Sequence, residues 1–117
     1  LHVAVTSDTV NMVDNNFLSK MKNDAFLINT SRGDLVDNIA LKNALLNGDI
    51  AGAGLDVYTP EPLEKDNPLL DIRLKNKLIL TPHIAGITHL TVEKIYKNIL
   101  ENMQNIIQGK ELKNKIN

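Results

Sequence analysis

Residues 25–57, AFLINTSRGDLVDNIALKNALLNGDIAGAGLDV, decide the fold of this chain. The run at residues 25–29 is apolar and predicts a strand that is covered on both faces, as in a buried parallel sheet. Asp37 suits the N-cap of a helix, and Gly48 suits its C-terminal end. Residues 50–57 predict a second strand, whose small residues would let a helix pack closely. Strand, helix and strand in this order predict a parallel α/β unit.

The rest of the chain extends this pattern. Two short apolar runs, residues 1–5 (Leu1-His2-Val3-Ala4-Val5) and 78–80, predict further strands. Asp14 or Asn15 can cap a short helix. From Thr88 onward, apolar residues recur every three or four positions, which predicts an amphipathic helix of about 20 residues. An irregular stretch is marked by Pro60, Pro62 and Pro68.

The fold class that follows is α/β, with a partial Rossmann-type doubly wound parallel sheet. The chain would supply the C-terminal half of such a domain plus a C-terminal helix, as one domain over residues 1–117. The Gly-rich phosphate loop of the first half is absent from the sequence. Gly52 and Gly54 lie inside a predicted strand and open no helix, so they do not form that loop.

Composition excludes several classes of function. A net charge of −1 and 3% aromatic residues give no basis for nucleic-acid or anionic-membrane binding. The chain has no cysteine, which rules out disulfides and zinc-thiolate sites and fits a cytoplasmic protein. No apolar run approaches the ~20 residues of a membrane span. The sequence shows no metal-ligand spacing, so we expect no metal site.

Three polar residues follow predicted strands: Arg32, Glu61 and His83. Because the ends of parallel strands meet at one edge of a sheet, these side chains are expected to converge in one crevice. A planar guanidinium there suits a carboxylate, and a histidine suits proton transfer near neutral pH. Glu61, held between two prolines, would favour the protonated imidazolium if it reached His83.

Each residue alone has an ordinary alternative. Arg32 is equally consistent with a surface arginine in a loop, His83 with a structural histidine, and Glu61 with an exposed loop acid. A hydrolase built from Ser31, Glu61 and His83 is a distant alternative, since Ser31 lacks the Gly-x-Ser-x-Gly elbow. Asp56, at the end of the strand in residues 50–57, could accept a hydrogen bond from a ligand amide or cap a turn.

Five blocks in the same order and spacing resemble the D-isomer-specific 2-hydroxyacid dehydrogenases over almost the whole chain. The blocks are LHVAVT (residues 1–6), NTSRG (29–33), IAGAGLDV (50–57), PEP (60–62) and TPHIAG (81–86). The resemblance implies an NAD-dependent oxidoreductase that acts on a small 2-hydroxy or 2-oxo acid, and it leaves NADP open. Members of the family often have proline at the positions of Ala4 and Ser7.

The resemblance also implies residue roles. Arg32 would orient the substrate, His83 would be the general acid in reduction and the base in oxidation, and Glu61 would pair with His83. Asp56 would hold the nicotinamide carboxamide. The other positions expected along the cofactor are Ala4, Thr6, Thr9, Thr30, Ser31 and Gly86, with Arg32 and His83 reaching it from the catalytic side.

The chain lacks the substrate domain and the Gly-rich half that the family carries. We therefore expect it to be the C-terminal portion of such an enzyme, as an excised piece, a proteolytic product or a truncated reading frame, and to be inactive alone. The alternative is a non-catalytic remnant or interaction module. An open strand at residues 1–5 would favour a homo-oligomer, such as a dimer, through that edge.

Overall fold

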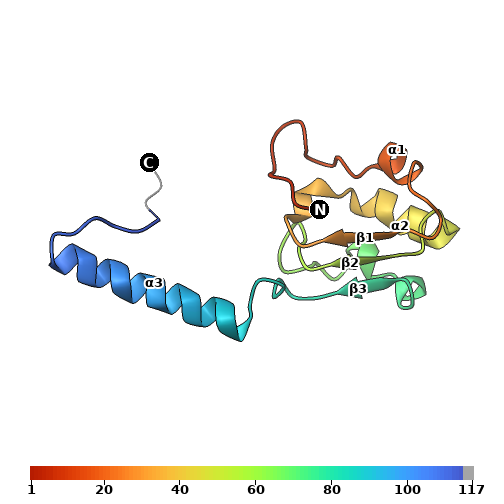
Figure 1. The fold of residues 1–117 in the computed structure, drawn as a ribbon. Helices are drawn as coiled ribbons and strands as arrows, with labels where there is room; N and C mark the ends of the chain where they lie inside the picture. The colour runs from red at the N-terminus through yellow and green to blue at the C-terminus, as the bar shows by residue number, and fades with distance from the viewer. Residues whose placement is uncertain (115–117) are drawn as a thin grey trace. The chain divides into compact units, whose positions relative to one another are not determined.

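A computed structural model describes residues 1–114 of the chain. Two compact units make up the molecule, Leu1–Ile84 and Ala85–Asn117. The first contains the sheet and every strand-end residue singled out above except Gly86. The second contains the long C-terminal helix (Figure 1).

The first unit is built on a three-stranded parallel sheet with the order β1-β2-β3. The strands are β1 (Phe26–Asn29), β2 (Gly52–Leu55) and β3 (Leu78–Leu80). Each was predicted from the sequence, and the parallel α/β class is confirmed. Register brings the strand ends level, because Asn29 pairs with Leu55 and Leu55 pairs with Leu80.

Helices α1 (Asn15–Leu18) and α2 (Asn38–Asn47) lie on the same side of this sheet (Figure 1). Asp14 caps α1, and the Asp37 carboxylate accepts from two N–H groups at the start of α2. Gly48 ends α2 in the left-handed conformation, with φ of +79°. Three single-turn 3₁₀ helices complete the unit: η1 (Gly33–Leu35), η2 (Pro68–Leu70) and η3 (Ile72–Leu74).

The hydrophobic core lies between α2 and the sheet. Leu41 and Leu45 of α2 are fully buried, and Leu27 of β1 and Leu55 of β2 belong to the same cluster. Burying such side chains supplies the main driving force for folding, at about 25 cal/mol per Å² of apolar surface. The core thus fixes α2 and the strands as one scaffold for the strand-end loops.

The opposite face of the sheet is open in the described chain, which corrects the expectation of strands covered on both faces. Phe26, Ile28 and Ile79 are 68%, 54% and 71% exposed. The small residues of β2 also have a different role from the one expected. A Cβ on Gly52 would meet the Phe26 ring, and a Cβ on Gly54 would meet the Ile28 side chain. Gly54 thus makes room for a neighbouring strand side chain, and Gly52 for both the Phe26 ring and the Lys77 carbonyl oxygen.

The strand expected at residues 1–5 is not formed, so this prediction was wrong. Leu1 ties the segment to the sheet: its ammonium group donates to the Ile28 carbonyl at 2.5 Å, and its carbonyl accepts from Ser31 Oγ at 2.6 Å. Residues 2–5 are exposed, and within residues 1–114 no strand ladder pairs them. An apolar run becomes a strand only where neighbours pair its backbone.

The second unit contains α3 (His89–Ile107), close to the predicted bounds. Thr88 caps it by accepting from the Thr91 N–H at 3.0 Å. Beyond the helix, Lys113 folds back and exchanges backbone bonds with the Asn102 side chain. None of the helices in residues 1–114 is long and apolar enough to cross a membrane.

Candidate active site at the carboxyl ends of the strands

Arg32, Glu61 and His83 stand on three loops that leave the same edge of the sheet. The Arg32 loop follows β1, the Glu61 loop follows β2, and the His83 loop follows β3. Register places the three strand ends side by side. The loops that carry Arg32, Glu61 and His83 therefore begin next to one another. The contacts between these loops decide which of the three side chains meet.

A buried asparagine shapes the Arg32 loop. Asn29 is fully buried; its Nδ2 donates to the Arg32 carbonyl at 2.8 Å, and its Oδ1 accepts from the Ser31 N–H at 3.0 Å. The Asn29 amide thus bonds both a backbone carbonyl and a backbone N–H of the turn that leaves β1. The Arg32 side chain is exposed beyond this turn, and its Nη1 donates to the Ser31 carbonyl at 2.6 Å.

Replacing Asn29 with alanine should destabilise the chain by about 2 kcal/mol, because two hydrogen bonds are lost at a buried position. Urea unfolding followed by circular dichroism measures this difference. Asn43→Ala is the matched control, since Asn43 is exposed on α2 and should change stability by less than about 0.5 kcal/mol. Equal unfolding midpoints for the two variants would contradict this role of Asn29.

Gly33 brings the Arg32 loop against the Glu61 loop. A Cβ at Gly33 would lie 2.0 Å from the Tyr58 carbonyl carbon, 2.3 Å from its oxygen and 2.5 Å from the Thr59 nitrogen. Only a residue without a side chain permits this approach of two backbones. The contact places the Arg32 charge close enough to Glu61 to help lower the pKa of that carboxyl.

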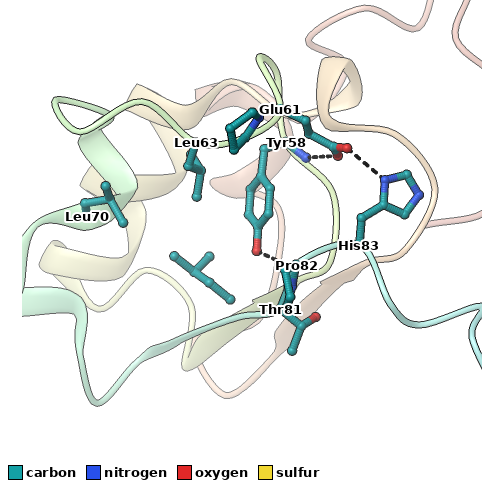
Figure 2. A pocket seen from close by; sticks show the side chains of 9 residues that line it. Tyr58, Glu61, Leu63, Leu70, Thr81, Pro82 and His83 are labelled. Carbon is teal, nitrogen blue, oxygen red and sulfur yellow. Dashed lines mark hydrogen bonds and ion pairs between the residues drawn. The ribbon is translucent and has the colours of Figure 1, made fainter.

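Glu61 and His83 form a direct pair. His83 Nδ1 lies 2.8 Å from Glu61 Oε2, and the Tyr58 N–H donates to Glu61 Oε1 at 2.9 Å (Figure 2). The hydrogen bond from His83, followed by that from the Tyr58 N–H, holds the pKa of the Glu61 carboxyl below its ordinary value. Glu61 is therefore ionised at neutral pH and can only accept from His83 Nδ1.

This lowered pKa gives a signed prediction for stability. The carboxylate of Glu61 stabilises the folded chain above its ordinary pKa of 4.5, and the contribution is lost as the pH falls through the lower folded-state value. The gap in unfolding free energy between the parent chain and Glu61→Gln should therefore be widest above about pH 5 and close in acid. Urea titrations at several pH values measure it.

His83 removal provides the control for that experiment, since its hydrogen bond is the largest cause of the lowered pKa. In a His83→Asn background, the same Glu61→Gln comparison should depend less on pH. A difference in unfolding free energy that stays constant from pH 7 to pH 3 would show that the Glu61 carboxylate gains no stability from its partners in the fold.

An apolar cavity of about 590 Å³ opens beside the pair (Figure 2). Tyr58, Leu63, Leu70 and Leu80 supply its apolar lining, with Glu61 and His83 at its edge. The pair itself stays accessible to solvent, since the His83 side chain is 52% exposed and the Glu61 side chain 35%.

The residues expected along the cofactor are only partly brought together. Ala4, Ser31 and Arg32 line a shared open cavity of about 720 Å³ at the strand ends. Thr6 and Thr9 lie in the turn after residues 1–5, where the Thr9 hydroxyl donates to the Ala4 carbonyl at 2.8 Å and lies 3.2 Å from the Thr6 hydroxyl. Thr6 and Thr9 do not line this cavity, so their place along the cofactor stays a prediction.

Thr30, Asp56 and Gly86 differ in how they relate to this cavity. Thr30 is exposed in the Arg32 loop. Asp56 is only 4% exposed, and its Oδ1 accepts from Thr81 Oγ1 and the Ile84 N–H. Gly86 belongs to the second unit, so its place near the nicotinamide stays a prediction.

Sequence reasoning missed the residues that assemble the loops: Asn29, Gly33, Tyr58 and Thr81. Two of them left a signal. Asn29 is a polar residue at the end of an apolar strand, and Gly33 directly follows the candidate arginine. Tyr58 and Thr81 act through contacts between loops distant in sequence, which no local pattern reveals.

Comparison with known proteins agrees with this geometry. The family model described as D-isomer specific 2-hydroxyacid dehydrogenase, NAD binding domain, matches residues 1–85. Glycerate dehydrogenase of Methylorubrum extorquens is 44% identical over 110 residues, which cover 94% of this chain and 35% of the relative. Glyoxylate reductase of Korarchaeum cryptofilum is 43% identical over 117 residues, which cover 100% and 34%.

Among solved structures, D-lactate dehydrogenase with NAD⁺ from Lactobacillus jensenii superposes with a TM-score of 0.86 at 30% identity, covering 100% of this chain and 38% of that one. Fold and matches together define a Rossmann-type NAD-binding domain. The chain belongs to the D-isomer-specific 2-hydroxyacid dehydrogenase family, which confirms the resemblance and its NAD cofactor. It spans about a third of the length of the curated relatives it matches.

Proposed function

We propose that this chain is the acid–base half of an NAD-dependent enzyme that interconverts a small 2-oxo acid and its D-2-hydroxy acid. Residues 1–117 would be the C-terminal portion of its NAD-binding domain. The observation that carries the proposal is the 2.8 Å contact between His83 Nδ1 and Glu61. It stands on the same sheet edge as Arg32, whose loop is pressed against the Glu61 loop through Gly33.

The pair determines which ring nitrogen meets the substrate. The ionised Glu61 requires a proton on His83 Nδ1, so proton exchange takes place at Nε2. In reduction, Nε2–H gives its proton to the carbonyl oxygen of the 2-oxo acid as the carbonyl becomes an alcohol. In oxidation, the bare Nε2 takes the hydroxyl proton, and Glu61 stabilises the imidazolium that results.

Arg32 would hold the substrate carboxylate. The guanidinium has five N–H donors, and the bond to the Ser31 carbonyl uses one of them. A paired bond to the carboxylate would orient the 2-oxo carbon next to His83. When bound, NAD(H) supplies the acceptor or donor of hydride; Ala4, Thr6, Thr9, Thr30, Ser31, Asp56 and Gly86 are the residues proposed to hold it.

A hydrolase is disfavoured by the Ser31 hydroxyl, whose proton is donated to the Leu1 carbonyl. The second candidate function is a non-catalytic remnant of the fold. Such a remnant would keep Arg32, Glu61 and His83 at the strand ends without turnover.

A chimera tests the proposal. In it, this chain replaces the matching C-terminal part of the Korarchaeum glyoxylate reductase, which aligns over all 117 residues. We expect NADH-dependent reduction of glyoxylate or hydroxypyruvate by the chimera, and none by the chain alone. A folded chimera that binds NADH but reduces neither acid would favour the remnant.

Self-association of the chain and a cytoplasmic location also stay predictions. The absence of a strand at residues 1–5 removes the expected route, whereas Phe26, Ile28 and Ile79 leave apolar side chains exposed on the sheet. Exposed apolar clusters of this kind favour association. Light scattering over a range of concentrations should show a species heavier than the 13.0 kDa monomer, and a monomer throughout would contradict this.

A further inference from the structure

His83 has a backbone conformation that is uncommon for a residue other than glycine. Its φ is +54°, in the left-handed region that side chains other than glycine seldom adopt. A residue held there costs free energy and persists only where its surroundings impose the conformation. The neighbouring contacts must therefore fix the turn that carries the imidazole.

The Asp56 side chain is hydrogen-bonded to residues on both sides of His83, Thr81 and Ile84. One carboxylate oxygen, Oδ1, accepts from Thr81 Oγ1 at 2.5 Å and from the Ile84 N–H at 2.9 Å. Asp56 is itself anchored, because it is 4% exposed and its N–H donates to the Asn29 carbonyl at 3.0 Å. Two bonds to one buried carboxyl oxygen therefore fix the residues on either side of His83.

Tyr58 connects the same turn to Glu61. Its hydroxyl lies 2.7 Å from the Thr81 carbonyl and 2.9 Å from the Leu55 carbonyl, and the Thr81 carbonyl also accepts from the His83 N–H at 3.0 Å. Its own N–H holds Glu61 Oε1. Burial raises the pKa of the Tyr58 hydroxyl, which therefore keeps its proton as a donor.

We propose that Asp56 and Tyr58 are positioning residues that clamp Thr81 and Ile84 and so hold the left-handed His83 with its Nδ1 on Glu61. The clamp rests on geometry alone, and its catalytic consequence rests on the proposed function. For Asp56 this is a second role beside the nicotinamide contact that the family resemblance implies. Loss of the clamp would let His83 relax and turn its ring away from Glu61.

Two variants break the clamp without touching the pair. Thr81→Val removes the hydroxyl bond to Asp56 at nearly constant volume, and Thr81→Ser is its matched control because it keeps the hydroxyl. Tyr58→Phe removes the hydroxyl, whose one proton is shared between the Thr81 and Leu55 carbonyls, and keeps the ring. These changes are smaller than Asp56→Ala, which would leave buried donors unpaired and endanger folding.

The readout is the Glu61 carboxyl titration, followed by ¹³C NMR on the 117-residue chain. Thr81→Val and Tyr58→Phe should raise the pKa of Glu61 by about half as much as His83→Asn raises it, or more, whereas Thr81→Ser should leave it near the parent value. A role in stability alone would leave the titration of the folded chain unchanged. Folded Thr81→Val and Tyr58→Phe variants that titrate like the parent would overturn the proposal.

The chimera gives a second, separate measurement. There Thr81→Val should lower kcat at least about tenfold and leave the KM for the 2-oxo acid within about twofold, since His83 acts in the transition state and Arg32 is untouched. An inactive parent chimera would count against the proposed function and leave the NMR result as the test of the clamp.

Discussion

Replacing His83 with asparagine in the chimera should lower kcat for 2-oxo acid reduction by about 10²–10⁴-fold, because the proton donor at Nε2 is lost. Asparagine is the informative replacement. It tolerates the left-handed backbone that His83 adopts, so the turn after β3 is kept while the titrating group is removed. Steady-state NADH oxidation measures the effect.

His89→Asn is the matched control for this variant. His89 is an exposed residue at the start of α3, and its replacement should leave kcat within about twofold. NADH binding to His83→Asn, followed by fluorescence, should remain, since the change removes a proton donor and no phosphate contact. A chimera that keeps its full rate without His83 would exclude the proposed acid.

The parts of this site that the sequence could predict follow from where parallel strands end. Each strand was visible as an apolar run, and parallel strands must bring their carboxyl ends to one edge. Arg32, Glu61 and His83 follow three such runs, so their placement on neighbouring loops followed from order alone. The pairing of Glu61 with His83 was implied by the family resemblance and not by strand order, and the structure has these side chains 2.8 Å apart.

Local pattern fails where a contact joins residues far apart in sequence. The exposure of Phe26 and Ile28 depends on what covers the sheet, and the missing strand at residues 1–5 depends on what pairs with it. Likewise, the need for glycine at position 33 comes from the backbone of Tyr58 on another loop. Tertiary contacts of this kind override local preference.

Gly33→Ala should destabilise the chain by about 3 kcal/mol or more, the upper range for overpacking. The new methyl group would meet the Tyr58 and Thr59 backbone at 2.0 to 2.5 Å, far inside van der Waals contact. Backbone cannot rotate away as a flexible side chain can, so the Arg32 loop or the Glu61 loop must move. Urea unfolding of the chain measures the loss of stability.

Gly86→Ala is the control for this effect. A Cβ at Gly86 would meet nothing within 4 Å, and alanine there should change stability by less than about 1 kcal/mol. Because Gly33 holds the loop of Arg32 against that of Glu61, the same change in the chimera should also raise the KM for the 2-oxo acid. Unfolding midpoints that agree between Gly33→Ala and Gly86→Ala would mean that the two loops do not need this contact, and the shared site of Arg32, Glu61 and His83 would lose its structural basis.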